Sequence, residues 1–180
     1  MRALFVQVLV RVRKGAAAAD AALAQMGFLQ DCACCGAHAL CVFADEESAK
    51  RGSCVCPQDQ QSHQPRKFGP LWCGALYDAT FVAAMADVAK CMASNLDKRM
   101  LPLMARIQEE ADVPWMYYDV ARRCGACGLG LVSVSALVMF LRALGHCASR
   151  THFTDQGIRT DASLQQLHDA IRSLARRSRQ

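Results

Sequence analysis

The chain has 180 residues and a formal net charge of +5, with 53% hydrophobic and 21% charged residues. This length allows one sizeable core or two small domains. The composition is that of an ordinary globular protein, so disorder is not the expected state. The apolar run ALFVQVLV near the N-terminus is much shorter than the ~20 residues that a membrane span requires, so no membrane segment is expected.

Eleven cysteines in a chain of this size would indicate a disulfide scaffold if the protein were secreted. ALFVQVLV could form the core of a signal peptide, but RVRK follows it where a small-residue cleavage site is expected. Several arginines and no acid before Asp20 are also compatible with a mitochondrial presequence. The alternation described next favours a strand instead. We therefore expect an intracellular protein with reduced or metal-bound thiols, in the nucleus, cytosol or mitochondrion.

Residues 1–27 are expected to form a strand and a helix. Between Phe5 and Arg13, valines alternate with Gln7 and Arg11, a period of two that is typical of a half-exposed strand. The segment AAAADAALAQM that follows has high helix propensity. A lone strand needs ladder partners, which must come from elsewhere in the protein.

Residues 28–67 are expected to form an irregular, metal-held module that ends in a polar linker. Cys32 and Cys35 form a C-x-x-C pair followed by Gly36, a turn that can direct two thiolates at one tetrahedral metal. Cys54 and Cys56 are the candidates for the second pair, although C-x-C is an uncomfortable spacing for one metal. Three side chains could replace one of these ligands: Cys34, Cys41 and His63. Structural zinc is expected, and the alternatives are cysteines that only pack and a site that has lost its metal.

Residues 68–175 carry the apolar spacing of several helices, followed by a basic tail at 176–180. Asp78 is a plausible N-cap for a helix whose apolar residues are Phe81, Met85, Val88 and Met92. Further helices are expected at 100–111, 116–123 and 133–144, the last of them buried.

The end of this region is expected to be a strand at HCASRTHF, a return strand at GIRT, and a helix capped by Asp161 or Ser163. Three helices followed by a hairpin are typical of a winged helix. The expected fold is therefore α+β: a small zinc-ribbon-like cysteine module followed by a helical, winged-helix-like domain.

The hairpin region holds the candidate RNA-binding residues, which are Arg150, His152, Arg159 and Thr160. Arginine and hydroxyl donors near a helix N-terminus suit a phosphate. The alternative is that the hydroxyls and Asp161 satisfy hairpin and cap hydrogen bonds among themselves. The arginines that crowd the C-terminus could attract a polyanion or simply form a solvated helix face.

No catalytic site can be assembled from the sequence. Cys124 and Cys127 form another C-x-x-C, but no second pair lies near it, so free thiols in a loop are expected and a redox role is not. GACGLG lacks the βαβ context of a dinucleotide loop. We find no serine elbow and no paired acids in an apolar pocket.

Four ordered segments resemble the C-terminal domain of the tRNA (guanine-26-N2)-dimethyltransferase family. FVQVLVRVRKG followed by CACCGAH resembles that family's strand and cysteine knuckle. FGPLWCGALYDATFV is similar to the family's Gly-Pro-aliphatic-Trp segment. EEADVPWMYYDVA is similar to a helix end and the start of the next helix. SRTH and GIRTDAS together are similar to its Ser-Arg-Thr-His and Gly-Ile-Lys-Thr-Asp-Ala-Pro motif.

The resemblance implies methyl transfer from S-adenosylmethionine to a guanosine of tRNA, with cysteines that bind zinc and a C-terminal domain that binds tRNA. The family's catalytic Rossmann-like domain would precede this chain, and the strand at 5–13 would be its last strand or a link to it. Arg150, His152 and Arg159 would be outermost on the RNA surface. The family usually has Cys-x-x-Cys where this chain has Cys54-Val55-Cys56.

Two classes of function follow. The chain is either the tRNA-binding part of a methyltransferase or a stand-alone tRNA-binding adaptor that has lost the chemistry. Cysteine-based redox or metal buffering is a third, weaker alternative.

Overall fold

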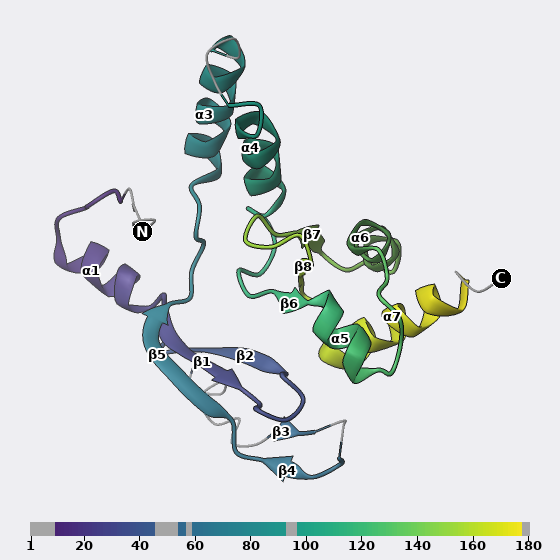
Figure 1. Ribbon diagram of the computed structural model, residues 1–180. Helices are drawn as coiled ribbons and strands as arrows, with labels where there is room; N and C mark the ends of the chain where they lie inside the picture. The colour runs from purple at the N-terminus through teal and green to yellow at the C-terminus, as the bar shows by residue number, and fades with distance from the viewer. Residues whose placement is uncertain (1–9, 46–53, 57–58, 93–96, 178–180) are drawn as a thin grey trace, which may run out of the picture. The chain divides into compact units, whose positions relative to one another are not determined.

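The computed structural model describes residues 10–45, 54–56, 59–92 and 97–177 (Figure 1). The chain forms two compact units, Met1–Gly74 and Ala75–Gln180. The expected start of the second domain at residue 68 differs from this division, in which residues 66–72 form a strand that pairs within the first unit.

Unit 1 is built on an antiparallel sheet with the order β2-β1-β5. Its elements are α1 Ala16–Leu23, β1 Met26–Asp31, β2 His38–Val42, β3 Cys54–Val55, β4 Ser62–His63 and β5 Arg66–Trp72. A separate two-stranded ladder joins β3 to β4. Gly27 on β1 must be a glycine, because a Cβ there would lie 2.3 Å from the Cys41 carbonyl oxygen.

The expected N-terminal strand is not formed where the structure describes it. Val10–Arg13 is irregular, and Val10 and Val12 are exposed. The rest of the Phe5–Arg13 segment lies outside the described residues. The helix that follows is confirmed as α1, but it buries none of its side chains. A strand has no ladder without a partner, and this short segment has none in the described part of unit 1.

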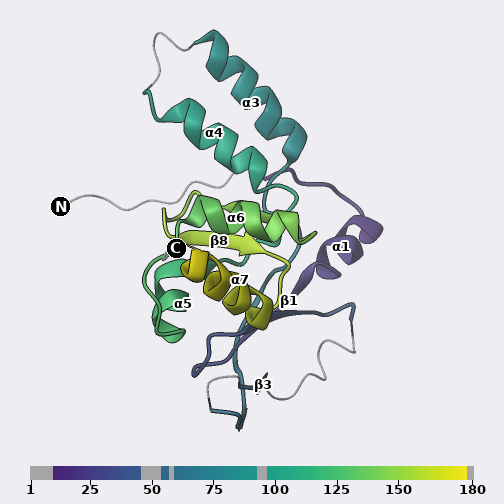
Figure 2. The same ribbon diagram turned by 90° about the vertical axis from the view of Figure 1, so that its right-hand side faces the viewer.

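Unit 2 is helical, with a small three-stranded sheet. Its elements are α3 Ala79–Cys91, α4 Met100–Glu109, β6 Tyr118–Asp119, α5 Val120–Ala126, α6 Val134–Ala143, β7 Ala148–Arg150, β8 Gly157–Thr160 and α7 Leu164–Arg177. The strands are antiparallel in the order β6-β8-β7. Figure 2 shows α3 and α4 side by side, and α6 lying along the sheet next to α7.

Several expected helix boundaries are confirmed by caps. The Asp78 side chain accepts a 3.0 Å hydrogen bond from the backbone of Phe81 at the start of α3. Ser163 and Gln166 exchange hydrogen bonds of 2.8 and 3.3 Å, which form the expected capping box of α7. The helix expected at 116–123 starts later, because Tyr118–Asp119 pairs with β8 and Asp119 caps α5.

The core of unit 2 lies between its sheet, α6 and α7. Ile158 of β8, Leu137 and Leu141 of α6, and Leu167 and Ile171 of α7 have no exposed surface. The expected burial of α6 is confirmed on one face only, since Met139 is 65% exposed.

The large apolar residues that recur at helical spacing on α3 face solvent. Phe81, Met85, Val88 and Met92 are all exposed, whereas the buried residues of α3 are Val82, Ala86 and Ala89. Alanine allows close approach to the partner helix α4, so α3 packs through its small residues.

No helix among the described residues combines the length and apolarity that a membrane crossing needs.

Candidate metal centre and candidate nucleic-acid interface

The first cysteine turn of unit 1 has the backbone geometry that a metal knuckle requires. The Gly36 amide donates to the Cys32 carbonyl and the Cys32 amide to the Ala37 carbonyl, each at 2.8 Å. Gly36 has a φ of +68°, which favours glycine at this position. The Ala37 amide points at the Cys35 sulfur, 3.4 Å away. The turn after β1 therefore presents Cys32 and Cys35 together.

A second turn repeats this hydrogen-bond pattern between β3 and β4. The Gln60 amide donates to the Cys56 carbonyl at 2.8 Å, and the Cys56 amide to the Gln61 carbonyl at 2.9 Å. Gln60, like Gly36, has positive φ, at +59°. Cys56 thus corresponds to Cys32, and the position that corresponds to Cys35 is held by Asp59. The sequence indicated Cys54 and Cys56 as the pair, but the turn begins at Cys56.

The four cysteines expected to bind zinc are gathered by these two turns. The sulfurs of Cys32, Cys35 and Cys56 lie within 4.8 Å of one another, and Cys54 Sγ is 3.6 Å from Cys35 Sγ. Zn–S bonds of about 2.3 Å place tetrahedral sulfurs roughly 3.8 Å apart. The sulfurs of Cys32, Cys35 and Cys56 are therefore close enough to share one metal, and Cys54 is in contact with one of them. Cys32, Cys35 and Cys56 are buried, and every cysteine in the described residues is free of disulfides.

The local electrostatics distinguish these thiols. Burial opposes ionisation of Cys32, but backbone hydrogen bonds from Cys35 and Cys34 outweigh it and lower the pKa of Cys32 to about 7. Burial raises the pKa of Cys35 and of Cys54. A metal ion would favour the thiolate form of all of them, because thiolate is the ligand.

The second C-x-x-C does not form a comparable site. Cys124 is buried in α5, and Cys127 caps the C-terminus of that helix rather than lying in a loop. Burial raises the pKa of Cys127, which disfavours the reactive thiolate. These cysteines pack against the helical core.

In unit 2, Glu110 is the centre of a buried polar network. Its Oε2 lies 3.1 Å from Arg159 Nη1, and both side chains are at most 1% exposed. His152 Nδ1 lies 3.1 Å from both carboxylate oxygens, and the His152 backbone amide also donates to Oε1. The Tyr77 hydroxyl lies 3.4 Å from His152 Nδ1, and the Arg159 guanidinium lies over the Tyr77 ring. Residues from three separate stretches of sequence thus converge on one carboxylate.

The network corrects the expectation that Arg159 is outermost. Arg159 is 1% exposed and Thr160 is 6% exposed, because β8 is the central strand of the sheet. The Thr160 hydroxyl accepts a 3.1 Å hydrogen bond from the Ala162 amide, as the alternative interpretation of the hydroxyls expected. His152 is partly exposed, with 20% of its side-chain surface accessible. Arg159 and Thr160 hold the hairpin rather than face outward.

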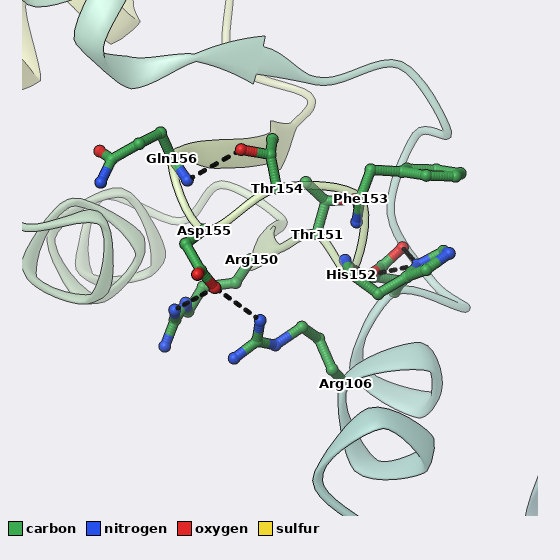
Figure 3. A network of polar contacts seen from close by, with 9 residues as sticks. Arg106, Arg150, Thr151, His152, Phe153, Thr154, Asp155 and Gln156 are labelled. Carbon is green, nitrogen blue, oxygen red and sulfur yellow. Dashed lines mark hydrogen bonds and ion pairs between the residues drawn. The ribbon is translucent and has the colours of Figure 1, made fainter. Parts of the chain in front are cut away.

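Two arginines remain on the outside of this network. Arg150 at the end of β7 and Arg106 on α4 point at the carboxylate of Asp155, at 3.8 and 3.4 Å (Figure 3). Their side chains are 34% and 29% exposed. A cavity of about 630 Å³ opens beside them, and its lining includes Lys98, Arg99 and Arg106.

An aromatic pair lies at the turn that also carries Asp155. Phe153, in the β7–β8 turn, is 58% exposed and stacks on Tyr117, with ring centroids 6.1 Å apart. The Phe153 ring also lies 4.1 Å from the His152 ring. Partly exposed arginines are suited to RNA phosphates, and an exposed stacked aromatic is suited to an unpaired base.

Sequence reasoning missed Glu110, Arg106 and Asp155. Glu110 falls in the EEADVPW segment, whose position at a helix end was noted but whose burial no local pattern signals. The pairing of Arg106 with Asp155 joins residues that are distant in sequence, so only the tertiary structure shows it.

The comparisons with known proteins agree on one family. A profile of the family described as "TRM: N2,N2-dimethylguanosine tRNA methyltransferase" matches residues 1–172. The tRNA (guanine(26)-N(2))-dimethyltransferase of Thermococcus kodakarensis is 31% identical over 88% of this chain and 37% of its own length. The enzyme of that name from Methanospirillum hungatei is 29% identical over 94% of the chain and 44% of its own length.

The fold is also similar to that of a solved structure, Trm1 from Pyrococcus horikoshii in complex with S-adenosyl-L-methionine. The TM-score is 0.67 at 24% identity, over 88% of this chain and 38% of that protein. The chain thus spans less than half the length of the relatives it matches. On the match to residues 1–172, the chain belongs to the N2,N2-dimethylguanosine tRNA methyltransferase family.

Proposed function

We propose that this chain is the tRNA-binding part of an S-adenosylmethionine-dependent tRNA (guanine-26-N2)-dimethyltransferase. The observation that carries the proposal is the surface formed by Arg106, Arg150 and Phe153 in a member of this family. S-adenosylmethionine and the catalytic groups would be supplied by the portion of the relatives that this chain does not match. Its place of action would be intracellular, where tRNA is found.

The element order supports a winged-helix interpretation of unit 2. The element order α4-β6-α5-α6-β7-β8 and the sheet order β6-β8-β7 are those expected of a winged helix, in which the β7–β8 hairpin would be the wing. In DNA-binding helix-turn-helix proteins the second helix reads bases. Here α6 exposes Ser135 and Met139, and its Arg142 donates to the Ala148 carbonyl at 2.7 Å. We therefore assign RNA contact to the wing and α4.

On this surface the arginines would bind phosphates and Phe153 would stack on an unpaired base. Phosphate contacts fix the orientation of a nucleic acid and carry little sequence information, so they suit recognition of the folded shape of tRNA. Asp155 would compete with the phosphates, because it pairs with both arginines in the free protein. The buried Glu110 network would hold the wing in place.

The test is tRNA binding by the full chain and by charge variants of this surface. Arg106→Ala with Arg150→Ala should weaken binding and reduce the slope of log K against log salt by about 2, one for each lost phosphate contact. Asp155→Asn should strengthen binding, because it removes the competing carboxylate. The control is Arg172→Ala, which removes an exposed arginine paired with Asp169 on α7. Equal effects of the arginine variants and the control would contradict this placement.

We also propose that the four-cysteine cluster binds structural zinc, because three of its sulfurs lie within 4.8 Å of one another and the fourth, Cys54 Sγ, is 3.6 Å from Cys35 Sγ. Metal removal should unfold unit 1, since thiolate sites contribute directly to folding. Zinc content of the purified chain that is independent of Cys32 would contradict it.

The alternative is a separate tRNA-binding adaptor. An antibody against residues 58–67 would distinguish the two in the source cells. A native polypeptide far above 19.7 kDa supports a methyltransferase, and a band at 19.7 kDa supports the adaptor.

A further inference from the structure

A second group of metal-binding side chains lies beside the four-cysteine cluster. One ligand atom from each of Cys34, Cys56, Asp59 and His63 lies within 4.8 Å of the others. The Asp59 Oδ2 atom is 2.7 Å from His63 Nε2 and 3.6 Å from Cys34 Sγ. Two sulfurs, an imidazole nitrogen and a carboxylate oxygen thus converge on one point in unit 1.

The backbone explains this convergence. Cys34 lies inside the first turn, between Cys32 and Cys35, so its thiol emerges on another side of that turn. Asp59 takes the place of a cysteine in the second turn, and its Oδ1 accepts a 3.1 Å hydrogen bond from the Gln61 amide. His63 is paired with Cys54 across the β3–β4 ladder. Two turns and one ladder therefore fix the positions of the donors before any ion binds.

Cys56 belongs to both groups. Its sulfur lies with those of Cys32 and Cys35 on one side and with the Cys34, Asp59 and His63 donors on the other. It has no exposed surface. A thiolate has more than one lone pair and can bind two cations at once, so Cys56 has the position of a bridging ligand.

We propose that unit 1 holds a second divalent cation, bound by Cys34, Asp59, His63 and the bridging thiolate of Cys56. The mixed sulfur, nitrogen and oxygen donors suit a borderline-soft ion such as Zn²⁺ or Cd²⁺ and not the oxygen-seeking Mg²⁺ or Ca²⁺. Without an ion, Asp59 and His63 would form only a partly exposed pair, and such pairs stabilise little.

The test is the zinc stoichiometry of the full chain, measured by native mass spectrometry after reconstitution with excess Zn²⁺ and buffer exchange. The wild type should hold two ions. Cys34→Ser combined with His63→Asn should hold one and keep the wild-type circular dichroism, because the four-cysteine site is untouched. Cys91→Ser, which removes an exposed cysteine of unit 2, should still hold two. A wild type that holds one ion, or a double variant that holds two, would overturn the proposal.

A second measurement tests the bridge without any substitution. The chain reconstituted with ¹¹³Cd²⁺ should give two ¹¹³Cd resonances that split each other through the shared sulfur of Cys56. A single resonance, or two without mutual splitting, would refute the bridge. Neither result bears on tRNA binding, which is assigned to unit 2, so failure here is distinguishable from failure of the proposed function.

Discussion

Replacing Glu110 by glutamine should strongly destabilise unit 2. The substitution keeps the size of the side chain and one acceptor oxygen for the His152 amide, but it removes the charge that faces Arg159. The guanidinium would then stay buried, at 1% exposure, without a counter-charge.

The magnitude follows from the geometry. At the 3.1 Å separation of Arg159 Nη1 and Glu110 Oε2, two unit charges attract by about 5 kcal/mol at an effective dielectric constant of about 20. Breaking a buried pair by removing one partner typically costs about 3–5 kcal/mol. We expect a loss of that size in the free energy of unfolding. Arg159→Met added to Glu110→Gln should recover most of it, because no uncompensated charge then remains.

The assay is urea unfolding followed by tryptophan fluorescence. The chain has two tryptophans, Trp72 in unit 1 and Trp115 in unit 2. In a Trp72→Phe background, fluorescence reports unit 2 alone. A loss of about 4 kcal/mol at a slope of about 2 kcal/mol/M moves the midpoint by about 2 M urea. Asp87→Asn is the matched control, since its partner Lys90 is 66% exposed and the pair is worth little.

A loss below about 1 kcal/mol for Glu110→Gln would refute the reasoning, as it would mean that Arg159 finds another partner or reaches water. A double variant as unstable as the single one would show that lost packing, and not unpaired charge, is responsible.

Three further predictions concern other parts of the chain. Cys32→Ser should lower the thermal unfolding midpoint of unit 1, reported by Trp72 fluorescence, and leave the midpoint of unit 2, reported by Trp115, unchanged. A shift of both midpoints would contradict the division into two units. Burial lowers the pKa of His168, so below its ordinary value of about 6.5 the unfolded chain takes up a proton that the folded one resists. Unit 2 should therefore lose stability as pH falls from 7 to 5.5, and His168→Leu should reduce this loss in urea titrations at each pH. Gly157→Ala should destabilise the wing, because its Cβ would lie 2.2 Å from Thr151 Cγ2; hydrogen exchange of the β7 and β8 amides that matches the wild type would exclude this clash.

Local patterns predicted the parts of the fold that local chemistry determines. The strand Gly157–Thr160 has the predicted limits, and the Asp78 and Ser163 caps are where hydroxyl and carboxylate side chains precede apolar helices. Periodicity failed on α3, because it cannot distinguish a large-residue stripe that faces solvent from a small-residue stripe that packs on α4. The Phe81 to Met92 stripe and the alanine stripe have the same helical period.

The candidate sites show the same division. The C-x-x-C spacing of Cys32 and Cys35 predicted the first knuckle, because a turn is a local structure. The role of Asp59 as the counterpart of Cys35 required the hydrogen-bond pattern of the second turn, which has no cysteine spacing to signal it. The burial of Arg159 could not be predicted from its own segment, because its counter-charge, Glu110, is distant in the sequence.

Binding of folded tRNA by this chain can be tested by a competition measured by fluorescence anisotropy at physiological salt. Labelled tRNA bound to the full chain would be displaced either by unlabelled tRNA or by a scrambled RNA of equal length and charge that cannot form the tRNA fold. We expect tRNA to compete at least about tenfold better, because the β7–β8 hairpin and α4 would hold phosphates in a fixed arrangement. Equal competition by the two RNAs would mean that the surface attracts any polyanion, and the claim would fail.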